Sequence, residues 1–313
     1  MKNVIVKNHE LEKKRGGLLR EVPEESVWLA NFVSPRTRQT YKNAVRDFVA
    51  FHQMTSPEEL RTIDHSHVIA WRDKLIAAGA SEKTINSRIS AISSLFKHLC
   101  EKQITRINPT IGVRRPPANS DQVKTPIMTP HEVRRMLDAP DLSKLKGCRD
   151  SAMLHILFYT GCRIAEVAKL KVKNFYEDGG YTVLDFTVKG GKRNKIAINH
   201  ELQIAIKKYL ERSGHALERE APLLLATQRA HLRKPLDPEQ LRKIFHQCAK
   251  KAGLPVGVTP HSARATFITQ ALEKKCPIEA VQRSVGHSKI STTQMYDKRL
   301  LKHRESASFV VVY

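Results

Sequence analysis

Cysteine is scarce, and the few cysteines present are not spaced for a shared role. The chain has five in 313 residues, and no two of them form a Cys-x-x-Cys pattern. This excludes the disulfide framework of a small secreted domain and a cysteine-based zinc site, and it predicts reduced thiols. The phosphate-binding motif Gly-x-x-x-x-Gly-Lys-Ser/Thr and dense carboxylate clusters are also missing. We therefore expect no nucleoside triphosphate, no metal ion and no other cofactor.

Long apolar runs are absent as well. No stretch approaches the roughly 20 apolar residues that a membrane-spanning helix needs. The first residues, MKNVIVKNHELEKKRGG, are charged and lack the apolar centre of a secretion signal. We therefore expect a cytoplasmic protein without a membrane partner.

Acidic residues are few in comparison with basic ones. Lys and Arg number 54 and Asp and Glu number 31, so the formal net charge is +23. An excess of this size predicts binding to a polyanion, with nucleic acid the first candidate and an acidic membrane surface the second. A merely soluble basic protein is the plainer alternative.

The chain divides into two predicted domains. Residues 1–22 are polar and basic, and we expect a flexible arm there. Residues 23–112 show helical periodicity, with helix starts predicted at the caps Ser34, Asp64 and Ser81. Residues 113–126 hold three prolines and no periodicity, which is typical of a linker. Residues 127–313 form the second domain.

The second domain is predicted to be helical around one hairpin. Residues 181–188 alternate apolar and polar side chains like a strand, Lys189-Gly190-Gly191-Lys192 makes the turn, and residues 195–198 return. Further helices are expected near 130–139, 147–159, 201–212 and 237–252. The predicted fold class is therefore mainly α with a small β-sheet.

The helix that begins after Ser81 has two different faces. One face is apolar at helical spacing, from Ile85 to Leu99, and the other carries small, hydroxyl and basic side chains. Small residues allow close approach to a bulky partner, and hydroxyls and cations suit phosphates and base edges. An ordinary solvated face fits the pattern equally well. The predicted DNA-contacting residues are Lys83, Thr84, Ser87, Arg88, Ser90, Ala91, Ser94 and Lys97, together with Arg114 and Arg115 of the linker.

The last quarter of the chain concentrates reactive side chains. His261 and Arg264 are three residues apart, so they share one face of a helix. His287 ends a Val-Gly-His-Ser turn, and Tyr296 follows a capping-box pattern at 291–294 that predicts a short helix. A guanidinium binds two phosphate oxygens, an imidazole takes or holds a proton, and a phenol becomes a nucleophile once deprotonated.

An arginine farther upstream is followed by a carboxylate three residues later. Arg163 stands at the start of a helix in Thr160-Gly-Cys-Arg-Ile-Ala-Glu166, and Glu166 is placed to hold its guanidinium by a charge-assisted hydrogen bond. Taken alone, the two residues also fit a common surface ion pair.

Together these motifs resemble the tyrosine recombinase (phage integrase) family. The resemblance rests on His261-x-x-Arg264, Gly286-His287-Ser288 and Tyr296, with the Thr160–Glu166 segment before them. It implies a two-domain DNA clamp, with a four-helix core-binding domain at 23–112 and an α+β catalytic domain at 127–313. No separate arm-binding domain is recognised, so the resemblance favours a simpler Xer-like enzyme or one carried by a transposon or plasmid.

The resemblance also implies a role for each reactive residue. Tyr296 would attack a DNA phosphorus to give a 3′-phosphotyrosine, between Arg163 and Arg264 on the non-bridging oxygens. His261 would accept the phenol proton and His287 would donate to a phosphate oxygen. Glu166 would support the site. Lys189 would protonate the leaving 5′-oxygen, with Lys192 as the alternative.

The implied partners follow from the same family. They are double-stranded DNA with inverted-repeat core sites and three further copies of the chain, which form a homotetramer on two duplexes. The alternative is a heterotetramer with a related recombinase, and accessory proteins are possible further partners. The enzyme would be nucleoid-associated. The apolar tail 309–313 either packs on its own domain or contacts a neighbouring protomer. Two rival functions remain: a type IB topoisomerase that relaxes one duplex, and a DNA-binding protein with a decayed site.

Overall fold

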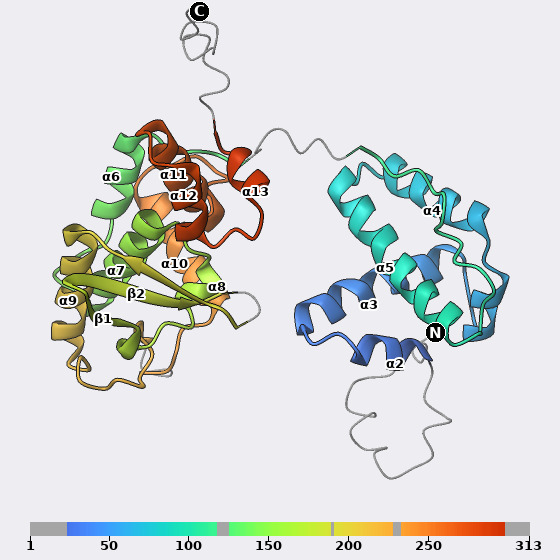
Figure 1. Ribbon diagram of the computed structural model, residues 1–313, viewed down its shortest axis with the longest axis horizontal. Coiled ribbons are helices and arrows are strands. Elements are labelled where there is room, and N and C mark those ends of the chain that lie inside the picture. The colour runs from blue at the N-terminus through green and yellow to red at the C-terminus, as the bar shows by residue number, and fades with distance from the viewer. Residues whose placement is uncertain (1–23, 118–124, 189–190, 228–232, 298–313) are drawn as a thin grey trace, which may run out of the picture. The chain divides into compact units, whose positions relative to one another are not determined.

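The computed structural model describes residues 24–117, 125–188, 191–227 and 233–297. The chain divides into two compact units, Met1–Asn119 and Ser120–Tyr313, each with its own core (Figure 1). The predicted arm 1–22, Lys189 and the apolar tail 309–313 lie outside the described residues.

In its described part, the first unit contains helices and no strands. Its predicted caps are confirmed, because the side chains of Ser34, Asp64 and Ser81 each accept a hydrogen bond from a backbone amide of the following helix. The elements are α2 (Glu24–Ala30), α3 (Pro35–Phe51), the 3₁₀ helix η2 (Pro57–Thr62), α4 (His65–Ala77) and α5 (Glu82–Glu101).

Helix α5 supplies the centre of this unit. Its apolar face is buried from Ile85 to Leu99, and Phe48 of α3 and Trp71 of α4 pack edge to face beside it. Each such side chain stabilises the fold by about 1.5–3 kcal/mol on burial. At 20 residues α5 is long but amphipathic. In the described residues, no helix combines the length and the apolar character needed to cross a bilayer.

The second unit joins helices to a three-stranded antiparallel sheet in the order β1-β2-β3. Together with the first unit, it confirms the predicted fold class. The helices are α6 (Pro130–Asp138), α7 (Leu145–Thr160), α8 (Ile164–Val167), the 3₁₀ helix η3 (Val172–Asn174), α9 (His200–Ser213), α10 (Pro238–Lys251), α11 (Pro260–Glu273), α12 (Ile278–Val285) and α13 (Ile290–Gln294). The strands are β1 (Phe175–Asp178), β2 (Tyr181–Thr187) and β3 (Arg193–Ala197).

Strand β1 was not predicted. Its sequence, Phe-Tyr-Glu-Asp, is short and ends in two residues that are uncommon in strands. Pairing with β2 holds it in place, with Phe175 opposite Leu184 and Asp178 opposite Tyr181. The Gly179-Gly180 turn, with both φ angles positive, brings the two strands together.

Helix α7 runs through the middle of the second unit, where α6, α9 and α11 pack around it (Figure 1). Most residues of α7 are buried. It ends at Gly161, whose φ of +61° is left-handed. A Cβ atom at this position would lie 2.5 Å from the ring of Phe267 on α11, so two separate constraints require glycine.

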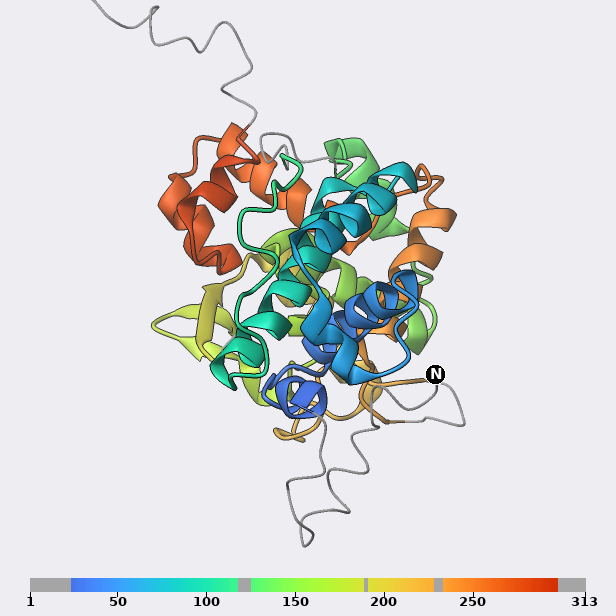
Figure 2. The same ribbon diagram turned by 90° about the vertical axis from the view of Figure 1, so that its right-hand side faces the viewer.

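Helices α11, α12 and α13 form one group in the second unit, drawn in orange to red in Figure 2. Strand β3 touches this group, because Asn194 donates a hydrogen bond to the carbonyl of Ser284 on α12. The capping box predicted at 291–294 is wrong: α13 begins at Ile290, and extended Lys289 is its N-cap. Ser291 therefore lies inside the first turn of the helix.

Candidate active site

Arg264 is the buried centre of the candidate site. Its guanidinium donates to the carbonyls of Gly161 at 2.6 Å and Val285 at 2.8 Å. These carbonyls end α7 and α12, and the negative ends of two helix dipoles therefore face the cation. Burial, and next the neighbouring charge of Arg163, lowers the pKa of Arg264 to about 10. Arg264 thus stays charged at neutral pH, and its position is fixed by backbone.

Arg163 is the N-cap of α8 and is held by Glu166. Its Nη1 donates to Oε1 of Glu166 at 2.8 Å, and its backbone amide donates to Oε2 at 2.8 Å. The predicted hydrogen bond is therefore present, and the carboxylate is buried. In the described part of the chain, the other guanidinium nitrogens have no hydrogen-bond partner, and the side chain is 38% exposed. Arg163 can therefore offer these donors to a ligand.

His287 follows Gly286, which ends α12 in a left-handed conformation. Its Nδ1 lies 2.9 Å from the hydroxyl oxygen of Thr293 on α13. Burial first, and then the charges of Arg264 and Arg163, lower the pKa of His287 to about 4. The imidazole is therefore neutral at physiological pH, with one nitrogen a donor and the other an acceptor.

Tyr296 follows α13 and lies beside these groups in the same chain. Its ring stacks on His287, with the centroids 6.3 Å apart and the planes inclined by 20°. The hydroxyl of Thr269 on α11 donates to its carbonyl at 3.2 Å. A negative charge on the Tyr296 phenol raises the pKa of Arg264. The phenol is thus held near both the imidazole and the buried guanidinium.

The remaining predicted catalytic residues have different positions. His261 is exposed in the first turn of α11, one turn before Arg264. Lys189 is not among the described residues, whereas the alternative, Lys192, is exposed beside β3. Among the described residues, no three His, Cys, Asp or Glu side chains gather in a metal-binding cluster.

The structure therefore brings four predicted residues together, namely Arg163, Arg264, His287 and Tyr296. Two guanidinium groups and one neutral imidazole thus come from neighbouring elements, and the phenol ring stacks on the imidazole. Fixed cations of this kind can stabilise the oxygens of a phosphoryl transition state, and a phenol becomes a nucleophile once it is deprotonated.

Sequence reasoning missed the groups that hold these side chains. The Gly161 and Val285 carbonyls accept from Arg264 across 103 and 21 residues of chain, which no local pattern reveals. Thr269 and Thr293 give some signal, because each is a hydroxyl residue near a motif residue on a predicted helix. Their buried hydroxyl groups require partners in any case.

The prediction that Ala91 contacts DNA is wrong. Ala91 is completely buried, so it belongs to the core of the first unit. Ser94 is half-buried, and its hydroxyl accepts from Trp28 Nε1 of α2 at 3.1 Å. Helix α2 therefore covers part of the face that the helical period of α5 left open.

The other α5 residues form a polar surface. Lys83, Thr84 and Ser87 are exposed, and Arg88 is paired with Asp47 of α3 at 2.8 Å. Lys97, farther along, is exposed and lies 3.9 Å from Glu101. A hollow of about 440 Å³ at the start of α5 is lined by Thr40, Asn43, Ala44, Ser81, Lys83, Thr84, Ser87 and Arg88.

Part of this lining comes from α3 and was not predicted. Thr40 and Asn43 face the hollow, and Asn43 accepts from Gln39 and Arg46. The polar stripe of α3 was the available signal.

The two predicted linker arginines lie against the first unit. Arg115 donates to the hydroxyl of Ser90 at 2.7 Å, which places a cation on the polar face of α5. The carbonyl of Arg114 accepts from Arg72 of α4 at 3.0 Å. Ser90 and Arg115 thus form one polar contact.

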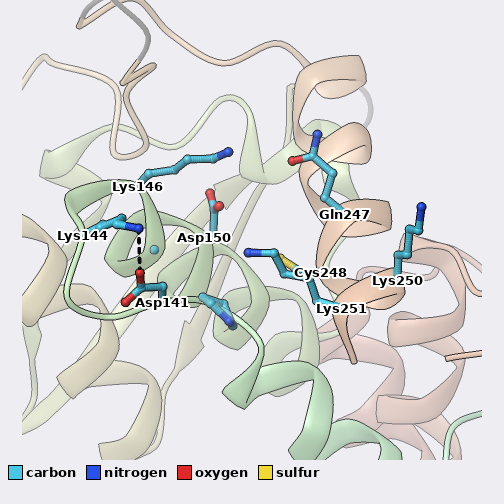
Figure 3. Close-up of a pocket in the computed structure, with 10 residues that line it drawn as sticks. Asp141, Lys144, Lys146, Asp150, Gln247, Cys248, Lys250 and Lys251 are labelled. Atoms are coloured by element: carbon cyan, nitrogen blue, oxygen red, sulfur yellow. Dashed lines mark ion pairs between the residues drawn. The ribbon is translucent and has the colours of Figure 1, made fainter. Parts of the chain in front are cut away.

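Another hollow lies in the second unit. It is separate from the group formed by Arg163, Arg264, His287 and Tyr296, here called the reactive cluster. It has a volume of about 650 Å³ and lies between the start of α7 and the end of α10 (Figure 3). Figure 3 shows Lys144 paired with Asp141, at 3.1 Å, across from Lys250 and Lys251. Helix α7 is about 24 Å long at 1.5 Å per residue, and the reactive cluster lies at its other end. This hollow therefore contains none of the predicted catalytic residues.

Two family models match the chain. The model of the phage integrase family matches residues 126–303, and that of the phage integrase N-terminal SAM-like domain matches residues 24–103. Among curated relatives, tyrosine recombinase XerA of Pyrococcus furiosus is 31% identical over 239 residues, which cover 75% of this chain and 76% of the relative. Tyrosine recombinase XerD of Staphylococcus saprophyticus is 27% identical over 270 residues, covering 86% of this chain and 90% of the relative.

Solved structures share the fold. A XerH site-specific recombinase in a post-cleavage complex with palindromic difH substrate has a TM-score of 0.73 at 18% identity, covering 99% of this chain and 91% of that chain. A lambda integrase tetramer bound to a Holliday junction has a TM-score of 0.66 at 18% identity, covering 94% of this chain and 78% of that chain.

Proposed function

Since the chain belongs to the phage integrase family and is a tyrosine recombinase, an enzyme that breaks and rejoins DNA strands, we propose that Tyr296 is its nucleophile in site-specific recombination. The observation that carries this proposal is the convergence, within one chain, of the Tyr296 ring, which stacks on His287, and the Arg264 guanidinium, which is bound to the carbonyl of Val285 two residues before His287.

Cleavage exchanges one phosphate ester for another. The Tyr296 oxygen bonds to phosphorus, the bond to the 5′-oxygen breaks, and a 3′-phosphotyrosine and a free 5′-hydroxyl result. His261 takes the phenol proton, and Lys189 gives a proton to the leaving 5′-oxygen, with Lys192 as the alternative donor. These proton transfers need residues within hydrogen-bond reach of the reacting oxygens.

The two arginines stabilise the charge that develops at phosphorus. Arg264 is held by two carbonyls and Arg163 by Glu166, so neither cation has to reorganise during the reaction. His287, being neutral, donates one further hydrogen bond to a non-bridging oxygen. Removal of one such donor typically slows a reaction by about 10²–10³-fold.

Rejoining reverses these steps. A 5′-hydroxyl from a partner strand attacks the phosphotyrosine, which releases Tyr296 and exchanges the strands. We assign this reaction to a tetramer on two duplexes with inverted-repeat core sites, because the similar lambda integrase was solved as a tetramer on a Holliday junction. A heterotetramer, in which a related recombinase replaces two of the protomers, is compatible with this assignment. Participation of accessory proteins is compatible with it too. We place this activity in the cytoplasm, in association with the nucleoid.

The two units divide the work in this proposal. Residues 23–112 hold the duplex through the polar surface of α5, residues 113–126 connect the units, and residues 127–313 cut the strand. A net charge of +23 supports an extended contact with the DNA backbone.

Replacement of Tyr296 by Phe tests the nucleophile. We expect Tyr296→Phe to bind core-site DNA as the wild type does and to form no covalent complex with a nicked suicide substrate, because only the phenolic oxygen is lost. Tyr181, which is 67% exposed on β2, provides the matched control, and Tyr181→Phe should form the complex at the normal rate. A covalent complex formed by Tyr296→Phe would overturn the assignment.

A further inference from the structure

Thr293 connects the two reactive rings of the site. It is completely buried, and its hydroxyl lies 2.9 Å from Nδ1 of His287. Its carbonyl accepts the backbone amide of Tyr296 at 3.0 Å. One residue of α13 therefore contacts both the imidazole and the residue that carries the phenol.

Either the Thr293 hydroxyl or the His287 imidazole can be the donor in the hydrogen bond between them. A hydroxyl both donates and accepts, whereas a neutral imidazole has one donor and one acceptor nitrogen. If Nδ1 carried the proton, Nε2 would present a lone pair to an anionic phosphate. If Thr293 donates to Nδ1, the proton lies on Nε2 and faces the phosphate as a donor. Only the second arrangement favours phosphate binding.

Thr293 has no competing acceptor among the described residues. The one hydrogen bond of its side chain there is that to His287. A buried hydroxyl proton without an acceptor costs about 1–3 kcal/mol, so donation to Nδ1 satisfies the hydroxyl as well as the ring. Both sides of the contact therefore favour the same tautomer.

We propose that Thr293 is a positioning residue that fixes His287 as the Nε2–H tautomer and so aims its proton at the scissile phosphate. This inference rests on the proposed function for its phosphate. Because Thr293 belongs to α13, the donor is set correctly only when the helix before Tyr296 is docked on His287. Nucleophile and phosphate donor are therefore delivered together.

Replacement of Thr293 by Val tests the contact, because valine keeps the shape and removes the hydroxyl. We expect Thr293→Val to form the covalent complex about 10–100-fold more slowly in single turnover, which is less than the roughly 10²–10³-fold typical of the complete removal of such a donor. Thr293→Ser restores the donor and should stay within about 3-fold of the wild type. The matched control is Thr292→Val, which removes the neighbouring hydroxyl of α13 and should cleave normally.

The tautomer provides a readout that a purely structural role would not change. With ¹⁵N-histidine labelling of the full chain, we expect the His287 ring to be protonated at Nε2 in the wild type and in Thr293→Ser. In Thr293→Val we expect a mixture of tautomers or the Nδ1–H form. This measurement needs no cleavage, so it tests the role of Thr293 even if the proposed nucleophile is wrong.

A double-mutant cycle separates this role from general loss of packing. In a His287→Ala background, Thr293→Val should cause no further loss of rate, because the two residues act as one unit. An unchanged tautomer in Thr293→Val, or the same rate loss with and without His287, would overturn the proposal.

Discussion

At the residue scale, the charged groups of the site are controlled by backbone and burial. Arg264 is surrounded by protein, and the two carbonyls at the ends of α7 and α12 fix both of its terminal nitrogens. The sequence predicted that Arg163 and Glu166 would interact, because they are three residues apart on one short helix. It could not predict the carbonyl contacts, which depend on how α7, α11 and α12 pack.

His287 provides a pH test at the same scale. Its pKa is about 4 in the folded chain, below the ordinary 6.5, so the unfolded chain binds a proton that the folded chain does not bind between these values. The free energy of unfolding therefore falls as the pH is lowered from about 6.5 to about 4. The sign follows because protons favour the state that binds more of them.

We expect His287→Asn to reduce this loss of stability in urea unfolding at pH 7 and pH 5. Exposed His200 at the start of α9 serves for comparison, and His200→Asn should leave the loss as it is in the wild type. An equal loss in His287→Asn and in the wild type would contradict the account of His287.

At the element scale, helix starts were predictable and buried faces less so. Caps such as Ser34 and Asp237 act on amides two or three residues away, so a local pattern is sufficient. Ala91 was assigned to the wrong face because the helical period shows which side of α5 is apolar, but does not show how far neighbouring helices cover its other sides. Strand β1 was missed because pairing with β2, rather than its own sequence, makes it a strand.

Gly161 is the element-scale test of the site. Gly161→Ala forces a left-handed alanine and places its Cβ 2.5 Å from Phe267, so we expect a loss of stability of about 1–3 kcal/mol from conformation and overpacking. Relief of this clash also moves the Gly161 carbonyl that holds Arg264, so cleavage should slow by at least about 10-fold. This effect is smaller than the rate loss expected when a whole donor is removed.

Gly179→Ala is the matched control for this prediction. Gly179 has a φ of +56°, but nothing lies within 4 Å of its added Cβ atom. It should lose stability by the conformational cost alone, about 1 kcal/mol, and keep normal cleavage. Equal cleavage rates for both variants would show that the Gly161 carbonyl does not position Arg264.

At the scale of the whole molecule, the proposed nucleophile and the buried arginine lie in the same chain. The Tyr296 ring stacks on His287, and Arg264 donates a hydrogen bond to the carbonyl of Val285, two residues before His287 in the same protomer. We therefore predict cleavage in cis. A mixture of Tyr296→Phe and Arg264→Lys protomers should form no covalent complex, because neither protomer holds both groups. Recovery of cleavage in the mixture would mean that one protomer supplies the nucleophile to the site of another.

Identification of the residue linked to DNA tests the central claim most directly. The wild-type enzyme is trapped on a nicked core-site substrate, digested with trypsin, and the peptide that carries the nucleotide is sequenced by mass spectrometry. The account predicts a single modified peptide, residues 290–298, with the phosphodiester on Tyr296. A nucleotide attached to any other residue, or a cleaved strand with no attached peptide, would contradict it.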